Sequence, residues 1–275
     1  MKKKYFKPKG ILSKYVDRYY IIERSEIYNF QLPKILPGTG LELIFHINNS
    51  LSINNEVLDK AHIICPRKIF KFDKTNSVSY LSVRFKSGAF RHFNAIPYNE
   101  LNDKYLSVND IWKNKGSELL NELNREKLTH RRIKIIEHFL LKQLLKHNHY
   151  DNEKWDKIIA TLYEKFNSIT INELSEKTNL SHRQFERSFK NQFGITAKKF
   201  QRITRLQDIT KKILLKKSSN LMDAILECGY YDQSHFINEF KEFIKLTPSE
   251  YFISDTFDNN FYFDSINKVS IKTCS

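Results

Sequence analysis

Cationic side chains recur at helical spacing in the stretch NLSHRQFERSFKNQFG, residues 179–194. At ~100° per residue, three phenylalanines share one face of a helix and three cations lie close together on the opposite side. The phenylalanines are Phe185, Phe189 and Phe193, and the cations are Arg183, Arg187 and Lys190. Arginine suits the edges of guanine bases and lysine suits phosphates. Most cationic faces of this kind are simply solvated. The other possibility is that this face contacts nucleic acid.

The same pattern occurs again 51 residues further along the chain, because residues 171–200 align without gaps to residues 222–251. The identities pair Phe185 with Phe236, Phe189 with Phe240, Lys190 with Lys241 and Thr196 with Thr247. In the second copy the exposed positions hold Ser234, Asn238 and Lys241, so hydrogen-bonding groups remain but both arginines are lost. Two copies of one supersecondary unit explain this repeat.

Each copy indicates a helix, a short turn and a second helix. In the first copy, a capping box of Thr170 and Glu173 opens a helix through Lys177, and Ser181 with Gln184 opens the next one. In the second copy, Gly229 occupies the turn and Asp232 caps the following helix. In this arrangement the second helix is the one that enters a DNA major groove. The candidate DNA-binding residues are therefore Ser181, His182, Arg183, Arg187, Lys190, Gln233, Ser234, Asn238 and Lys241.

Charge is unevenly distributed in this region. The whole chain carries +15, and residues 181–217 hold eleven Lys or Arg against two acids, whereas residues 218–264 hold two Lys against nine acids. Neutralising phosphates supplies much of the affinity for DNA. We therefore expect the first unit to dominate binding and the second to add discrimination or to position a partner.

A linking helix is predicted between the two units over residues 203–217, where apolar residues recur at helical spacing. Such a helix is ~22 Å long, shorter than the ~34 Å between adjacent major grooves. The sequence thus predicts either bent DNA or incomplete engagement by one unit. Lysines 211, 212, 216 and 217 either contact the DNA backbone or are solvated.

Residues 155–253 resemble the DNA-binding domain of AraC/XylS-type transcriptional regulators. The strongest match is GYYDQSHFINEFKEFIKLTPSEY, residues 229–251, with a Gly-aromatic turn, a Phe-x-x-x-Phe-Lys core and a Thr-Pro-Ser-x-Tyr ending. The match departs at Asn238, where many members have arginine, at Lys245, where a glycine is usual, and at Ala197, where a proline is common. The resemblance implies a sequence-specific transcriptional regulator that binds double-stranded DNA.

The first 150 residues show a different pattern. Short apolar runs separated by turn signals over residues 20–86 predict an antiparallel sheet or barrel. From residue 88 onward the signal becomes helical, over residues 88–96, 108–124 and 130–148. The helix over residues 130–148 could pack on the barrel, link to the DNA-binding part or form a dimer. The fold class is therefore α+β, with an N-terminal domain (1–150), a DNA-binding domain (151–255) of two helix-turn-helix units joined by a helix, and a tail (256–275).

This N-terminal half resembles one AraC-type subgroup on LPGTGLELIFHI and on VRFKSGAFRHFNAIPYNELNDKYLSVNDIW. That resemblance implies a domain that senses a small-molecule effector or mediates a homodimer, and it leaves contact with RNA polymerase open. Alternative readings are a DNA-architectural protein of low specificity or an enzyme with a catalytic barrel. Glu42 and His46 share a strand face, but a hydrogen-bonded structural pair is the commoner arrangement.

Several classes find no support in the sequence. It has no phosphate-binding loop, no catalytic motif and no metal-ligand spacing, so we expect no cofactor and no enzyme. Its three cysteines, Cys65, Cys228 and Cys274, share no pairing pattern. No apolar run reaches the ~18 residues that span a bilayer, and the basic N-terminus lacks the features of a signal peptide. We therefore expect a cytoplasmic protein.

Overall fold

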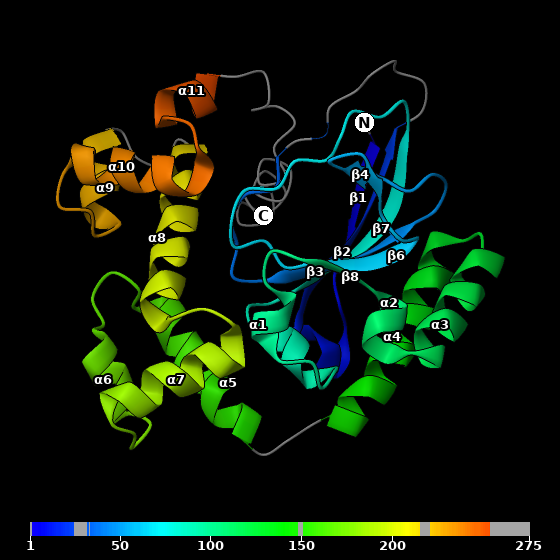
Figure 1. Cartoon of the computed structure of the whole chain (residues 1–275), viewed down its shortest axis with the longest axis horizontal. Coiled ribbons are helices and arrows are strands. Elements are labelled where there is room, and N and C mark those ends of the chain that lie inside the picture. Colours follow the sequence, from blue (N-terminus) through cyan, green and yellow to red (C-terminus); the bar gives the residue numbers. More distant parts are fainter. Residues whose placement is uncertain (1, 25–31, 33, 148–150, 215–220, 254–275) are drawn as a thin grey trace, which may run out of the picture.

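The computed structural model describes residues 2–24, 32, 34–147, 151–214 and 221–253 of the 275-residue chain. All strands among these residues lie in the N-terminal part, residues 2–147, and the C-terminal part, residues 151–253, is helical (Figure 1). The predicted α+β class is confirmed.

Six antiparallel strands form one sheet in the order β1, β2, β7, β3, β6, β8. Their bounds are β1 Lys2–Phe6, β2 Val16–Arg24, β3 Leu41–His46, β6 Ala61–Ile64, β7 Val78–Phe85 and β8 Tyr105–Ser107, and β4 Ser52–Ile53 with β5 Glu56–Val57 forms a separate hairpin. In the described residues no pairing joins β1 to β8. The sheet is therefore open rather than a closed barrel.

The expectation that strands end at about residue 86 was wrong, because β8 follows the first helical turns of the chain. Its three residues are too few to show alternation, and its pairing with β6, through Leu106 and Ile63, is a contact between distant segments. Strand β1 was missed as well. Its lysines, typical of an exposed edge strand, hide the pattern that marks a core strand.

Both faces of the central strand β3 are buried. Its side chains therefore point alternately into two hydrophobic cores, and neither face of the strand meets solvent. Leu41, Leu43 and Phe45 face the core shared with the helices of the N-terminal part. Ile44 faces a second core, which the segment around Leu58 and Phe72 covers. A strand buried on both sides holds little freedom to shift register.

Helices cover one face of the sheet. They are α1 Tyr98–Leu101, α2 Val108–Trp112, α3 Asn114–Arg125 and α4 Thr129–His147, with 3-10 turns η1 Gly10–Lys14 and η2 Ala89–His92. The helix predicted over 108–124 is broken at Lys113, whose φ is 54°. Only η2 forms in the region predicted as helical from residue 88 to 96. Of the three roles considered for α4, packing on the sheet is the observed one, since Ile133, Ile136 and Leu140 are buried there.

The C-terminal part consists of helices α5 Asp151–Glu164, α6 Ile171–Glu176, α7 His182–Phe193, α8 Ala197–Leu214, α9 Leu221–Glu227, α10 Gln233–Ile244 and α11 Pro248–Ile253. The linking helix α8 begins six residues earlier than predicted, and the last residues of the predicted range lie outside the described ones. It runs between α6 and α7 at one end and α9 and α10 at the other (Figure 1). The two-unit architecture is confirmed.

Candidate nucleic-acid interface

The turn that presents α7 is built by the predicted caps. The amide of Glu173 donates to Thr170 Oγ1 at 3.2 Å, and the amide of Gln184 donates to Ser181 Oγ at 3.4 Å. Both glutamate and glutamine reach back to the amide of the capping residue, so each cap is a complete capping box. Asn179 makes the turn with φ 55°. These caps fix where α7 begins and which face it exposes.

Helix α7 has one buried and one exposed face, as predicted. Phe185, Phe189 and Phe193 are at most 1% exposed and pack around Trp155 of α5. Arg183, Arg187 and Lys190 are exposed, together with Ser181 and His182 at the start of the helix. Within the described part of the chain none of the three cations forms an ion pair with an acid. This face therefore presents unneutralised positive charge to solvent.

Helix α10 has the same division with a different exposed face. Phe236, Phe240 and Ile244 are buried, and Asp232 caps the helix by accepting from the amide of His235 at 2.7 Å. The four candidate residues of this unit are all exposed, namely Gln233, Ser234, Asn238 and Lys241. Lys245 takes the left-handed conformation at the end of α10, with φ 63°, where Gly194 ends α7 with φ 75°. The lysine thus tolerates the position at which the family usually has glycine.

The structure gathers the nine candidate residues into two groups, one on each recognition helix. Five lie on α7 and its cap, and four lie on α10, at the two ends of α8 (Figure 1). The α7 group contains Arg183, Arg187 and Lys190, whereas the α10 group contains one cation, Lys241. The asymmetry predicted from composition is therefore present on the exposed surface as well.

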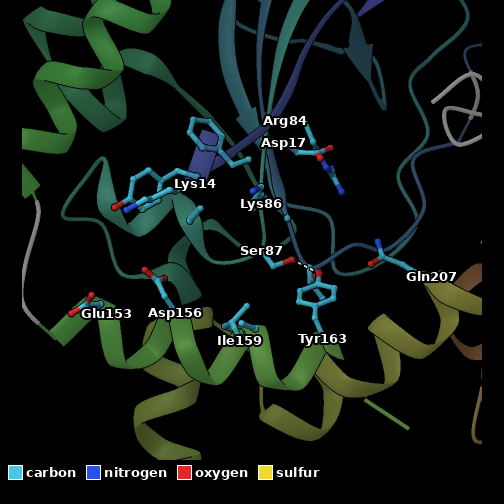
Figure 2. Close-up of a pocket in the computed structure, with 16 residues that line it drawn as sticks. Lys14, Asp17, Arg84, Lys86, Ser87, Glu153, Asp156, Ile159, Tyr163 and Gln207 are labelled. Carbon is cyan, nitrogen blue, oxygen red and sulfur yellow. Dashed lines mark hydrogen bonds between the residues drawn. The ribbon is translucent and has the colours of Figure 1, made fainter. Parts of the chain in front are cut away.

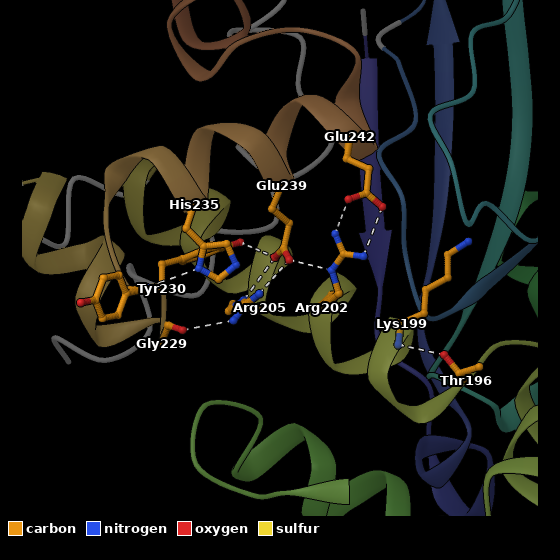
Figure 3. A network of polar contacts seen from close by, with 10 residues as sticks. Thr196, Lys199, Arg202, Arg205, Gly229, Tyr230, His235, Glu239 and Glu242 are labelled. Carbon is orange, nitrogen blue, oxygen red and sulfur yellow. Dashed lines mark hydrogen bonds and ion pairs between the residues drawn. The ribbon is translucent and has the colours of Figure 1, made fainter.

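An ion-pair network between α8 and α10, absent from the sequence prediction, holds the second unit (Figure 3). The carboxylate of Glu239, whose side chain is 2% exposed, accepts from Arg202 Nε and from Arg205 Nη2, both at 2.7 Å. Tyr230 Oη also donates to Glu239, at 2.9 Å, and Arg205 lies over the Tyr230 ring. Arg202 reaches Glu242 as well, and this hydrogen bond is the largest cause of the raised pKa of the guanidinium.

Part of the basic charge counted between residues 181 and 217 is therefore neutralised inside the protein. Arg202 and Arg205 pair with acids of α10, and Lys212 lies 3.0 Å from Glu227 of α9 and 3.5 Å from Asp208. Lys212, for which the sequence left DNA contact and solvation open, thus takes part in ion pairs within the protein. Lys211 is exposed, whereas lysines 216 and 217 lie outside the described residues. The three cations of α7 therefore remain exposed, as do Lys198 and Lys211 of α8.

The end of α7 rests on the N-terminal part. Asn102 Nδ2 donates to the Gly194 carbonyl at 2.7 Å, and Arg91 forms an ion pair with Asp156 of α5 and lies over the Phe193 ring. Two glycines, Gly194 and Gly88, allow the two parts of the chain to approach closely here. A Cβ on Gly194 would lie 2.1 Å from Asn102 Nδ2, and one on Gly88 would lie 2.4 Å from the Phe193 ring. The contact joins the first unit, rather than the second, to the sheet domain.

Asp156 is the acidic centre of this contact. His92 Nε2 lies 3.2 Å from Asp156 Oδ1, the same oxygen that the Arg91 guanidinium contacts. Partial burial of Asp156 favours its neutral form, but the hydrogen bond with His92 and the charge of Arg91 outweigh it, so the pKa of Asp156 is lowered. The carboxylate is therefore charged at neutral pH.

The candidate enzyme pair is engaged in structural contacts. Glu42 accepts from Arg84 Nη1 at 2.9 Å and from the Tyr20 hydroxyl. His46 instead stacks on His62, with ring centroids 5.1 Å apart. In the residues that the structure covers, no three or more His, Cys, Asp or Glu side chains are grouped as metal ligands. Cys65 and Cys228 are buried thiols, and Cys274 lies outside that coverage.

In comparisons with known proteins, a family model matches a segment of each part of the chain. A family model described as a helix-turn-helix domain matches residues 174–253, and a model described as a domain of unknown function matches residues 4–107. Residues 174–253 form a helix-turn-helix domain of the AraC type, which confirms the resemblance found in the sequence.

None of the described helices is both long and apolar enough to cross a membrane.

Three curated relatives are named as transcriptional regulators. An uncharacterized HTH-type transcriptional regulator of Haemophilus influenzae is 36% identical over 95 residues, which cover 34% of this chain and 31% of the relative. The probable transcriptional regulator LumQ of Photobacterium leiognathi is 27% identical over 108 residues, covering 37% and 43%. The uncharacterized HTH-type transcriptional regulator YbfI of Bacillus subtilis is 26% identical over 203 residues, covering 64% and 72%. The chain thus matches less than half the length of the first two relatives.

Among solved structures, ToxT from Vibrio cholerae is similar to this chain with a TM-score of 0.46 and 13% identity, covering 85% of this chain and 96% of ToxT.

Proposed function

We propose that this chain is a sequence-specific DNA-binding transcriptional regulator that reads double-stranded DNA chiefly through α7. The observation that carries the proposal is the exposed face of Arg183, Arg187 and Lys190 on the second helix of a capped helix-turn-helix unit. Arginine bidentate to guanine and lysine to phosphate are the contacts that such a helix makes in a major groove.

The second unit has a smaller share in this proposal. Its exposed face carries Asn238 and Lys241 but no arginine, and the arginines of α8 nearest to it are paired with Glu239. Asn238 suits adenine, so the second unit discriminates between sequences more than it adds affinity. The rigid pairing of α10 with α8 sets the separation of the two reading helices.

The N-terminal part is proposed to sense a small-molecule effector or to mediate a homodimer. Support comes from its direct contact with the first unit through Asn102 and Arg91, which gives a change in the sheet domain a route to α7. A regulator of this kind acts in the cytoplasm and works together with RNA polymerase. No enzymatic role is proposed, since the named relatives are all regulators.

Footprinting of the full chain on genomic fragments tests the proposal. A regulator protects a few defined sites at affinities ~10³-fold or more above nonspecific binding. A DNA-architectural protein, the alternative function, would instead coat fragments with little preference. Uniform protection of unrelated fragments would replace the proposal by that alternative.

The dominance of the first unit is tested by comparing Lys190→Ala with Lys241→Ala, since these residues occupy equivalent positions in the repeat. We expect the Lys190 variant to lose more affinity and more of the salt dependence of binding, because α7 holds the larger cationic group. Equal losses of affinity in the two variants would show that both units contribute equally to DNA binding.

A further inference from the structure

A cavity of about 660 Å³ lies between the N-terminal part and the C-terminal part (Figure 2). One wall consists of the end of β7 together with the end of η1 and the residues that follow it, and the opposite wall is α5, with Gln207 of α8 at one end. Sites for small molecules commonly have this size and occur at domain boundaries. Neither recognition helix contributes to it, so the cavity is separate from the candidate DNA interface.

The two walls carry opposite charge. Lys14, Arg84 and Lys86 come from the sheet side, and Glu153 and Asp156 come from α5. Asp17, also on the sheet side, lies 3.6 Å from Arg18.

Three of these charges, Lys14, Lys86 and Glu153, have no ion-pair partner among the described residues. Arg84 is paired with Glu42, and Asp156 with Arg91. Lys86 donates only to the Ser13 carbonyl, at 2.8 Å, and among the described residues neither Lys86 nor Glu153 has an ion-pair partner. The sheet wall thus offers two unneutralised lysines to an occupant, and α5 offers one unneutralised carboxylate.

Hydroxyl groups connect the walls at one side of the cavity. Thr39 and Ser87 of the N-terminal part both hydrogen-bond the hydroxyl of Tyr163 on α5. These groups donate and accept, so they suit an amide or a carboxylate more than a hydrocarbon chain. Apolar side chains also line the cavity, among them Phe85, Ile159 and Ala160.

We propose that this cavity binds a small zwitterion, an amino acid or short peptide, whose carboxylate faces Lys86 and whose ammonium group faces Glu153. A ligand with only negative charge would meet the carboxylates of α5, and one with only positive charge would meet the lysines of the opposite wall. A zwitterion satisfies both walls at once. This assignment deepens the proposed effector sensing and rests on it only for the regulatory consequence.

Binding is coupled to the arrangement of the two parts because each part supplies one of the charged walls. A ligand that contacts both walls has higher affinity for the docked arrangement, and it therefore stabilises that arrangement. The docked arrangement also holds the end of α7 against Asn102. The zwitterion thereby acts on the first reading unit without touching it.

The test uses thermal unfolding of the full chain with three matched probes: a library of free dipeptides, the same library N-acetylated, and the same library C-amidated. The free library should raise Tm by about 3 °C or more at saturating concentration. The acetylated library lacks the ammonium group and the amidated library lacks the carboxylate, so both should give at most a small part of that shift. No shift with the free library, or an equal shift with the acetylated library, would overturn the zwitterion assignment.

Two variants locate the site. Glu153→Gln and Lys86→Gln replace exposed side chains that are dispensable for the core, and each should remove most of the shift given by the free library. Glu118→Gln and Lys142→Gln, which change a cleft between α3 and α4, serve as matched controls and should keep it. A shift that survives both cavity variants would place binding elsewhere. Footprints taken without peptide test DNA binding separately, so loss of the peptide effect with intact footprints contradicts only the ligand site.

Discussion

Single cations of the C-terminal part differ in whether an acid neutralises them. Arg202 and Arg205 form ion pairs with Glu239, whereas Arg183 and Arg187 have no acidic partner in the described residues. A sequence count treats all four alike, because pairing depends on which side of α8 faces α10. The exposed arginines of α7 are therefore the ones whose loss should change DNA recognition.

Replacing Arg187 with alanine should weaken binding to a mapped site by ~1–3 kcal/mol and relax the preference for one base pair, if the guanidinium reads a base edge. The measurement is a titration against the site and its single-base variants. Arg125→Ala, an exposed arginine at the end of α3, is the control and should leave binding unchanged. Unchanged affinity and unchanged preference in Arg187→Ala would remove this residue from the reading face.

The stacked histidines of the sheet domain make its stability sensitive to acid. Burial is the main reason why the pKa of His46 is lowered from 6.5 to about 3 and that of His62 from 6.5 to about 4. Both rings are neutral in the folded protein, whereas in the unfolded chain they bind protons below pH 6.5. Their contribution to stability is therefore complete above pH 6.5 and is lost as pH falls toward the lowered pKa values.

At pH 5.0 each histidine should cost about 2 kcal/mol of unfolding free energy relative to pH 7.5. Urea titrations monitored by Trp112 fluorescence, in a Trp155→Phe background, report on the N-terminal part, since these are the only tryptophans of the chain. His46→Phe should reduce the loss between the two pH values by about half. An unfolding free energy that does not change from pH 7.5 to pH 5.0 would contradict the neutral buried pair.

At the scale of elements, local signals predicted most of the C-terminal part. The capping residues Thr170 and Ser181, the turn at Gly229 and the phenylalanine stripes act within one or two turns of a helix, so sequence spacing contains them. The break at Lys113 and the short strand β8 were missed, because each depends on contacts with distant residues. Glu239 gave an unused signal, since a carboxylate between Phe236 and Phe240 on the core side of a helix requires a buried partner.

Glu239→Gln should weaken the docking of α10 on α8. Removing one partner of a buried ion pair costs ~3–5 kcal/mol, although the partly exposed arginines place the expected value at the lower end. Glu242→Gln is a matched control on the same helix, because its side chain is 57% exposed and its ion pair should be worth less than ~1 kcal/mol. Hydrogen exchange of the α9 and α10 amides measures both effects. Equal protection in the two variants would show that Glu239 does not hold the second unit.

At the scale of the whole molecule, no pattern in the sequence predicted the contact between the two parts. Asn102 and Gly194 are 92 residues apart, and neither belongs to a periodic pattern that points to the other. The same holds for the wall residues Lys86 and Glu153, whose charges are ordinary until the fold sets them across one cavity. Charge composition predicted a positively charged surface for DNA. It did not predict the ion pairs within the protein that lower the exposed positive charge of that surface.

Gly194→Ala should separate the first unit from the sheet domain. Both Gly194 and Gly229 have left-handed backbone, with φ of 75° and 78°, so alanine strains each position similarly. Their surroundings differ, because a Cβ at Gly194 would meet Asn102 and Tyr98 within 2.8 Å, whereas one at Gly229 has its nearest neighbour at 3.3 Å. Hydrogen exchange in η2 and α1 should therefore rise in Gly194→Ala and stay unchanged in Gly229→Ala. A rise in both variants would attribute the effect to backbone strain alone.

The contact at Asn102 and Arg91 also has a consequence for biosynthesis. Translation delivers the chain from its N-terminus, and domains fold as they emerge. The surface formed by η2 and α1 is therefore complete before the ribosome releases α5, α6 and α7. The first unit meets this finished surface as it emerges, and Phe200 of α8 then completes its core against Phe189 and Phe193. The second unit emerges last and docks on α8 through Arg202 and Arg205. We therefore expect the two repeats, alike in sequence, to fold by different routes during synthesis.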